Sequence, residues 1–162
     1  VKADYKPRVD AGEVAEAATM LGRPHMLSGA VVAGDGRGRQ LGFPTCNLAH
    51  PPEALPAHGV YAVLVDRLED GQARALARGV ANVGLRPTVA ATERPLVEVH
   101  LLDFAGDLYG AELRVHVGAR LRAEKRFDGL DALRAQIDAD SARARSLLAD
   151  GEPATDAGGA WA

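Results

Sequence analysis

The sequence is poor in cysteine, lysine and aromatic residues, and each shortage argues against a class of function. A single cysteine, Cys46, rules out an internal disulfide and fits a reducing compartment. Lys2, Lys6 and Lys125 are the only lysines, and a formal net charge of -3 argues against a broad nucleic-acid or acidic-membrane surface. Aromatic residues make up only 4% of the chain, whereas a small nucleic-acid-binding barrel needs exposed aromatics along a basic groove.

Long apolar runs are absent as well. No stretch approaches the roughly 20 apolar residues that a membrane-spanning helix needs, and the opening VKADYKPRVDAG lacks the apolar core of a signal peptide. A chain of 162 residues suits one domain with a sizeable core. We therefore expect a soluble, cytoplasmic protein that binds neither nucleic acid nor membranes.

The first part of the chain predicts one short helix and two strands. Residues 1–9 are polar and irregular, and Asp10 is expected to cap a helix over 11–21 that Gly22 ends. The apolar run 27–33 predicts a strand, and 43–49 predicts a short second strand beyond a glycine-rich loop. The segment 51–59 holds too many prolines for either regular element.

The second part predicts further strands and a final helix. Strands are expected over 59–68, 73–84, 95–104 and 111–121, with a hairpin turn at Asp70-Gly71 and a loop over 86–88. Asp128 is expected to cap a helix over 130–148, whose apolar stripe comprises Leu130, Leu133, Ile137, Ala144 and Leu148. Strands joined by short turns, with helices only at the ends, favour an antiparallel sheet closed into a small barrel, with ligands bound at its mouth or on outer loops.

The stretch GDGRGRQLGFPTCNL, residues 34–48, gathers residue types that suit a phosphate and metal site. Its glycines let a backbone approach a ligand closely, and the guanidinium groups of Arg37 and Arg39 suit phosphate oxygens. Thr45 and Asn47 point to one side of an extended chain and offer the oxygen ligands that a hard cation prefers. An ordinary glycine-rich hairpin with solvated arginines fits the same composition, so the stretch alone leaves both interpretations open.

Four segments resemble the riboflavin kinase family, in particular the kinase module of bacterial bifunctional FAD synthetases. They are LGRPHMLSGAVVAGDGRGRQLGFPTCNL, GVANVGLRPTV, VEVHLLDFAGDLYG and LRAEKRFDGLDALRAQIDAD, and the match that contains them extends over about residues 20–145. The resemblance implies a mainly β fold, a six-stranded antiparallel Greek-key barrel with a short N-terminal helix and a long C-terminal helix. It also implies magnesium-dependent transfer of the γ-phosphate of ATP to the 5′-hydroxyl of riboflavin, giving FMN and ADP.

The same resemblance implies roles for particular residues. Glu98 would be the catalytic carboxylate, and Thr45 and Asn47 would sit at the magnesium ion and the nucleotide phosphates. The ATP-binding set would comprise Gly34, Arg39, Thr45, Asn47, Leu101, Asp103 and Tyr109, and the flavin-binding set Arg122, Lys125 and Phe127. Two departures are visible: Cys46 stands where the family usually has alanine, and the glycine loop has no lysine, which leaves Arg39 as its cationic candidate.

The resemblance also suggests how the chain is divided. Residues 1–21 would be a linker and a short helix, a remnant of an upstream nucleotidyltransferase domain; residues 22–150 would form the kinase barrel, and 151–162 a disordered tail. No HxGH-type nucleotidyltransferase motif occurs in the sequence. FMN adenylylation is therefore not expected of this chain by itself, although a longer protein could carry an adenylyltransferase domain.

Residue chemistry supports the kinase interpretation without deciding it. Glu98 alternates with Val97 and Val99, so it points outward if the valines face the core, as a catalytic base or a solvated glutamate would. Asp103 could meet the nucleotide or turn the chain, and Phe127 could stack on a flavin or pack at the start of the last helix. The histidines show no metal-ligand spacing. A kinase for another small alcohol and a non-catalytic flavin-binding module remain alternatives.

Overall fold

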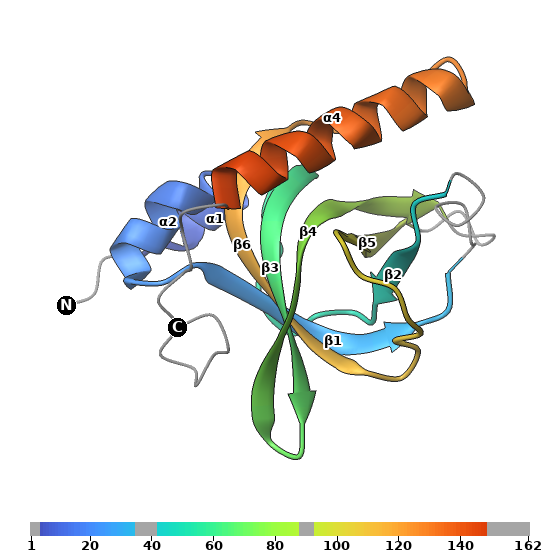
Figure 1. Cartoon of the computed structure of the whole chain (residues 1–162). Coiled ribbons are helices and arrows are strands. Elements are labelled where there is room, and N and C mark those ends of the chain that lie inside the picture. The colour runs from blue at the N-terminus through green and yellow to red at the C-terminus, as the bar shows by residue number, and fades with distance from the viewer. Residues whose placement is uncertain (1–3, 35–41, 88–92, 149–162) are drawn as a thin grey trace.

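Six antiparallel strands close into a barrel in the part of the chain that the computed structural model describes, residues 4–34, 42–87 and 93–148. The strands are β1 (His25–Val32), β2 (Thr45–Leu48), β3 (Gly59–Glu69), β4 (Gln72–Pro87), β5 (Glu93–Leu101) and β6 (Glu112–Arg122). Their order around the barrel is β1, β2, β5, β4, β3, β6 (Figure 1). Because β6 returns beside β3 after the consecutive strands β3 to β5, the predicted Greek key is confirmed.

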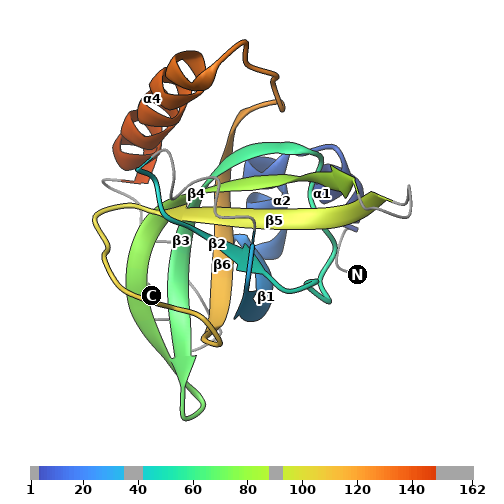
Figure 2. The ribbon, with the colours of Figure 1, turned by 90° about the vertical axis from the view of Figure 1, so that its right-hand side faces the viewer.

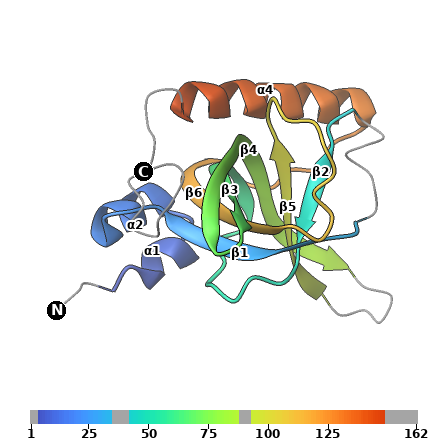
Figure 3. The same ribbon diagram turned by 60° about the horizontal axis from the view of Figure 1, so that its bottom comes forward.

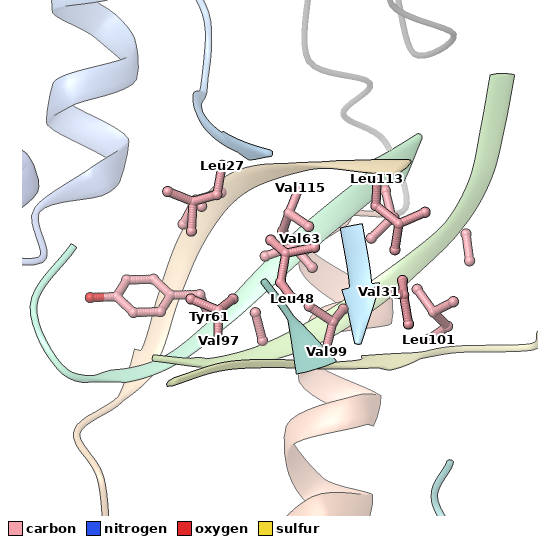
Figure 4. Close-up of a cluster of buried hydrophobic side chains, with 14 of the residues drawn as sticks. Leu27, Val31, Leu48, Tyr61, Val63, Val97, Val99, Leu101, Leu113 and Val115 are labelled. Atoms are coloured by element: carbon pink, nitrogen blue, oxygen red, sulfur yellow. The ribbon is translucent and has the colours of Figure 1, made fainter. Parts of the chain in front are cut away.

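Alternate side chains from every strand fill the interior of the barrel. In β5 the inward residues are Val97, Val99 and Leu101, all buried, as the alternation of this strand predicts. They pack with Leu27, Val31, Leu48, Tyr61, Val63, Leu113 and Val115 (Figure 4). Fully burying a valine or leucine side chain contributes about 1.5 to 3 kcal/mol, so this cluster is the main stabilising element of the barrel.

The strand β3 is apolar on both faces because both faces are covered. Its inward residues join the barrel core, while Val60, Ala62 and Leu64 point outward and pack beneath α4 (Leu130–Leu148). The helix crosses the outside of the barrel (Figures 1 and 2). Its buried residues Ala144 and Leu148 complete this second cluster, so the C-terminal half of α4 is the part anchored to the sheet.

The β3–β4 turn has the predicted geometry. Asp70 and Gly71 both have positive φ angles, 51° and 77°, as a two-residue hairpin turn with the twist of its flanking strands requires. Glu69 pairs with Gln72 directly beside the turn. The hairpin projects beyond the body of the barrel (Figures 1 and 2), and it points toward the viewer in Figure 3.

Two helices replace the single helix expected over 11–21. They are α1 (Lys6–Asp10) and α2 (Val14–Leu21), separated by Gly12, whose φ of 79° breaks the helical path. The prediction that Asp10 caps a helix is wrong: Asp10 ends α1 and forms an ion pair with Lys6 at 2.7 Å. Gly22 ends α2 as predicted, in the left-handed conformation.

Other boundaries also differ from the prediction. Arg86 and Pro87 do not lie in a loop, because β4 continues through Pro87 in register with β5; Thr88 and the tail 151–162 lie outside the described residues. The apolar stripe predicted for α4 is wrong at its start, where Leu130 is 64% exposed. The buried residues of the helix are Asp140, Ser141, Ala144 and Leu148, because only its later turns rest on the barrel. No helix within the described ranges is both long and apolar enough to cross a membrane.

Candidate functional site

A row of polar side chains crosses three adjacent strands on the outer face of the barrel. The strand β5 lies between β2 and β4, and its residue Glu98 pairs in register with Asn47 on one side and Asn82 on the other. Since Val97 and Val99 face the core, Glu98 points outward, as the sequence pattern predicted. Residues opposite one another share a face, so a carboxylate and two amides stand side by side.

Thr45 is hydrogen-bonded to Glu98. Its Oγ1 atom donates to Oε1 of Glu98 over 2.7 Å, and this hydroxyl keeps its lone pairs available for another ligand. The backbone just before Thr45 is held by His100, whose Nδ1 lies 3.0 Å from the carbonyl oxygen of Pro44. The imidazole also meets the ring of Phe43 edge to face, with centroids 5.4 Å apart. These contacts fix the segment that carries the Thr45 hydroxyl.

Gly34 lies directly against the side chain of Asn47. The two strands β1 and β2 pair Val32 with Asn47, and the chain leaving β1 passes over the Asn47 amide. A Cβ atom added to Gly34 would lie 1.6 Å from Nδ2 of Asn47, which no side chain can tolerate without displacing the amide. The glycine therefore lets the end of β1 pack onto one of the predicted metal ligands.

A hollow of about 970 Å³ lies beside this polar row, between the barrel and the N-terminal half of α4. Its polar lining comes from β2, β4, β5, the end of β6 and the segment that follows it: Thr45, Asn82, Glu98, His100, Arg122, Glu124, Lys125 and Arg126, with Asp140 from α4. Its apolar lining comprises Phe43, Val60, Val80, Leu85, Phe127, Leu130, Leu133 and Ile137. One wall can therefore hold charged groups while the other accepts a flat apolar ring system.

Cations gather over the ring of Phe127 at the edge of the hollow. The guanidinium carbon of Arg122 lies 5.7 Å from the ring centroid and Nζ of Lys125 lies 5.5 Å from it. Both distances fall within the range of cation–π attraction. The three residues of the predicted flavin-binding set are thus brought together, and all three line the same hollow as Glu98.

Three residues of the predicted ATP-binding set lie elsewhere. Leu101 is buried in the barrel core, and Tyr109 is 71% exposed on the loop before β6. Asp103 has a φ of 55° and forms an ion pair with Arg145 at 3.1 Å, which lowers the pKa of its carboxyl group through a hydrogen bond and charge attraction. None of these three residues lines the hollow. A fourth member of the set, Arg39, lies outside the described residues, as do Arg37, Gly36 and Gly38.

Several residues of the site were not singled out from the sequence. Asn82 becomes visible only through the register of β4 with β5, and Asp140 lies in a helix whose buried face was misjudged. His100 has no metal-ligand spacing in the sequence to mark it, and in the structure its Nδ1 is hydrogen-bonded to the backbone at Pro44. Cys46 packs against the barrel core, and burial raises the pKa of its thiol, so it is not an activated nucleophile.

The donor set fits a hard cation that shares its ligands with phosphate groups. Thr45, Asn47 and Glu98 offer oxygen atoms, which magnesium prefers. Within the described residues no group of three or more His, Cys, Asp or Glu side chains could hold a metal ion. A cation at this row would therefore depend on oxygens from a nucleotide and from water, as magnesium commonly does.

The family model that matches this chain is Flavokinase, described as riboflavin kinase, and it covers residues 21–148. The bifunctional riboflavin kinase/FMN adenylyltransferase of Pseudomonas fluorescens is 49% identical over 130 residues, which are 80% of this chain and 40% of that protein. The enzyme of the same name from Escherichia coli (strain K12) is 45% identical over 141 residues, 87% of this chain and 44% of that protein. The chain thus spans less than half the length of these curated relatives.

Two solved structures share the fold. A macrolide-efflux protein from Streptococcus pneumoniae superposes with a TM-score of 0.77 at 36% identity, over 87% of this chain and 45% of that one. A riboflavin kinase from Trypanosoma brucei superposes with a TM-score of 0.55 at 25% identity, over 79% of this chain and 82% of that one. The two similarities support the barrel with its C-terminal helix as a shared architecture.

Proposed function

This chain belongs to the riboflavin kinase family, and we propose that it transfers the γ-phosphate of ATP to the 5′-hydroxyl of riboflavin, giving FMN and ADP. The observation that carries the proposal is the pairing of Glu98 with Thr45 at the wall of a hollow that also contains Lys125 and Phe127. A carboxylate, a hydroxyl, an aromatic ring and cations meet there. These are the groups that joining a phosphate to a flavin alcohol requires.

Glu98 is proposed as the general base. Its Oε1 accepts the Thr45 hydrogen bond, which orients the carboxylate, and Oε2 has no hydrogen-bond partner among the described residues. In the reaction Oε2 takes the proton of the ribityl 5′-hydroxyl as that oxygen bonds to the γ-phosphorus. The bond from the γ-phosphorus to the bridging oxygen breaks, and ADP leaves with the electron pair.

Thr45 and Asn47 are proposed as the protein ligands of a magnesium ion. The fit rests on their oxygen atoms, on their position beside Glu98 and on the close packing of Gly34 against Asn47. When bound, magnesium neutralises charge on the phosphates of ATP. The residues themselves hold the phosphate end of the nucleotide at the polar row. Gly34 and Arg39 remain proposed nucleotide-loop residues, and Leu101, Asp103 and Tyr109 remain proposed only at the nucleotide border.

The flavin is proposed to lie between the barrel and α4. Phe127 offers a π face to the isoalloxazine ring, and Lys125 offers a donor to its polar edge. Leu130, Leu133 and Ile137 supply the apolar side of the hollow from the helix. Burying the flat ring there would exclude water from the reacting hydroxyl.

The domain assignment is a proposal as well. We assign the kinase to residues 22–150, and we treat the FMN adenylyltransferase activity in the relatives' names as a property of those longer proteins. If this chain is part of a longer protein, an adenylyltransferase domain is the partner that the relatives suggest. The proposed partners of the barrel itself are riboflavin or FMN and ATP or ADP.

One incubation tests the proposal. The protein is mixed with riboflavin, ATP and magnesium, and FMN is measured by chromatography, with EDTA added to a parallel sample. We expect FMN only where the metal is present. Riboflavin that binds without yielding FMN at any metal concentration would instead favour the non-catalytic flavin-binding module, and FAD formation would add a second activity.

A further inference from the structure

Asp140 is a buried carboxylate at the inner edge of the hollow. Its side chain is 7% exposed, and it stands on the face of α4 that turns toward the barrel. Arg122 Nε donates to both carboxylate oxygens, at 3.1 and 3.0 Å, and Arg122 Nη2 donates to Oδ2 at 2.9 Å. Gln136 Nε2 adds a bond of 2.9 Å to Oδ1. Because the Asp140 carboxylate accepts all of these hydrogen bonds, it fixes both the plane and the position of the Arg122 guanidinium.

Arg122 connects Asp140 to the residues that are proposed to bind the flavin. It is the last residue of β6, and its Nη1 donates to the carbonyl oxygen of Ala123 at 3.1 Å, where the chain turns toward the hollow. Its guanidinium also lies over the ring of Phe127. One side chain therefore touches the helix, the turn and the aromatic ring that the flavin is proposed to meet.

We propose that Asp140 is a positioning residue for flavin binding, acting through Arg122 on Phe127 and the 123–127 segment. This inference rests on the proposed function and deepens it, because it makes α4 part of the flavin site. Since the charge of Arg122 is neutralised by Asp140, Arg122 supplies geometry, and Lys125 supplies the positive charge toward the ligand. A buried ion pair adds little net stability compared with apolar residues of similar volume. Its role here is to hold the Arg122 and Asp140 side chains in one arrangement.

Attachment of α4 does not by itself require Asp140. Arg143 Nη1 donates to the carbonyl oxygen of Leu121 at 2.7 Å, and Arg145 pairs with Asp103 at 3.1 Å. Both contacts tie the helix to the barrel outside the hollow, whereas Asp140 and Arg122 line it. Arg143 is thus a matched control, because it anchors the same helix beside the same strand without touching Phe127.

The test measures riboflavin affinity by flavin fluorescence in the absence of ATP. Asp140→Asn keeps the shape of the side chain but loses the charge that holds the guanidinium, so we expect riboflavin to bind about tenfold more weakly, or about 1.4 kcal/mol. ATP affinity, measured by calorimetry, should stay within about twofold of wild type. Arg143→Ala should leave both affinities unchanged. A loss that affects riboflavin and ATP equally, or that Arg143→Ala reproduces, would overturn the positioning role.

A double-mutant cycle checks that Asp140 acts through Arg122. If it does, Asp140→Asn combined with Arg122→Gln should weaken riboflavin binding no more than Arg122→Gln alone. Additive losses would contradict the proposal. Should Asp140→Asn fail to fold, Arg122→Lys replaces it, because lysine keeps the charge but cannot bind both carboxylate oxygens in one plane. The expected loss of riboflavin affinity is the same.

The outcomes separate this inference from the proposed function. Riboflavin binding without any FMN formation would remove the kinase proposal and leave the role of Asp140 standing. FMN formation with equal riboflavin affinity for wild type and Asp140→Asn would remove only the role of Asp140. A wild-type protein that binds no riboflavin would overturn both.

Discussion

Thr45 donates a hydrogen bond of 2.7 Å to Glu98, a residue 53 positions away in the sequence. The bond occupies one carboxylate oxygen and sets the direction of the other. The bond is possible because β2 and β5 pair antiparallel with Asn47 opposite Glu98, which brings the side chain of Thr45 beside Glu98 on the same face. The proposed base and the proposed metal ligand therefore form one unit, and changing either should disturb the other.

Replacing Glu98 with glutamine tests the base. The amide oxygen can still accept the Thr45 hydrogen bond, but the side chain can no longer take a proton from the flavin hydroxyl. We expect kcat to fall by about 10²- to 10⁴-fold, the usual contribution of positioned general-base catalysis. FMN formation under saturating substrates measures kcat, and calorimetry should find ATP affinity nearly unchanged. Turnover within a few-fold of wild type would mean that the proton goes elsewhere.

Replacing Gly34 with alanine tests the packing against Asn47. The new methyl group would require the space now held by the Asn47 amide, and the amide can swing away because it is the end of a side chain. We expect kcat/KM for ATP to fall by at least about tenfold, because misplaced ligands lose orientation. The free energy of unfolding should change by less than about 1 kcal/mol, as is usual when no core contact is lost.

Gly118 provides the comparison for that variant. A Cβ atom there would meet its nearest neighbours at ordinary distances, 3.4 Å from Ala62 and Leu148, far from the polar row. Gly118→Ala should therefore leave kcat/KM unchanged. If Gly34→Ala were as active as Gly118→Ala, the position of the Asn47 amide would not matter for the reaction.

A buried histidine predicts how stability depends on pH. His116 lies beside Asp66 and Arg114, and its pKa is lowered because burial disfavours the imidazolium form more than the Asp66 hydrogen bond favours it. Below the ordinary pKa of 6.5 the unfolded chain therefore binds a proton that the folded protein does not. The free energy of unfolding should fall as pH drops below about 6.5, and this contribution is fully present above that pH.

Urea unfolding at a series of pH values measures this dependence. Replacing His116 with glutamine should flatten the curve between about pH 5 and 7, even if it lowers the overall stability, because the titrating group is gone. The matching variant His58→Gln removes an exposed histidine and should keep the slope of wild type. An equal slope in all three proteins would place the pH dependence on other groups.

The sequence allowed the barrel to be predicted because its alternation survives in the structure. Val97 and Val99 point inward and Glu98 outward, which follows from the two-residue period of a strand. The hairpin at Asp70-Gly71 followed equally from local chemistry, since both residues tolerate positive φ. Features that depend on a single strand or a single turn could therefore be predicted from the sequence.

Features that depend on strand register or on the docking of a helix could not be predicted from the sequence. Asn82 stands beside Glu98 only because β4 and β5 pair with that offset, and no property of the segment GVANVG alone indicates it. The predicted stripe of α4 counted Leu130 as core, whereas this residue borders the hollow and Asp140 is buried. An acidic residue on the buried face is visible only once its partner Arg122 is placed.

His100 provides the last prediction, because it supports the backbone that presents Thr45. The carbonyl oxygen of Pro44 can only accept, so His100 Nδ1 carries the proton in this contact, while the ring packs edge to face on Phe43. Asparagine can place an amide donor near the position of Nδ1, whereas phenylalanine keeps only the ring contact. We expect His100→Asn to retain kcat within about threefold and His100→Phe to lose at least about tenfold, because the Thr45 hydroxyl is no longer held in place. Thermal unfolding of both variants checks that the barrel is intact, and a His100→Phe protein as active as His100→Asn would show that Phe43 packing alone positions Thr45.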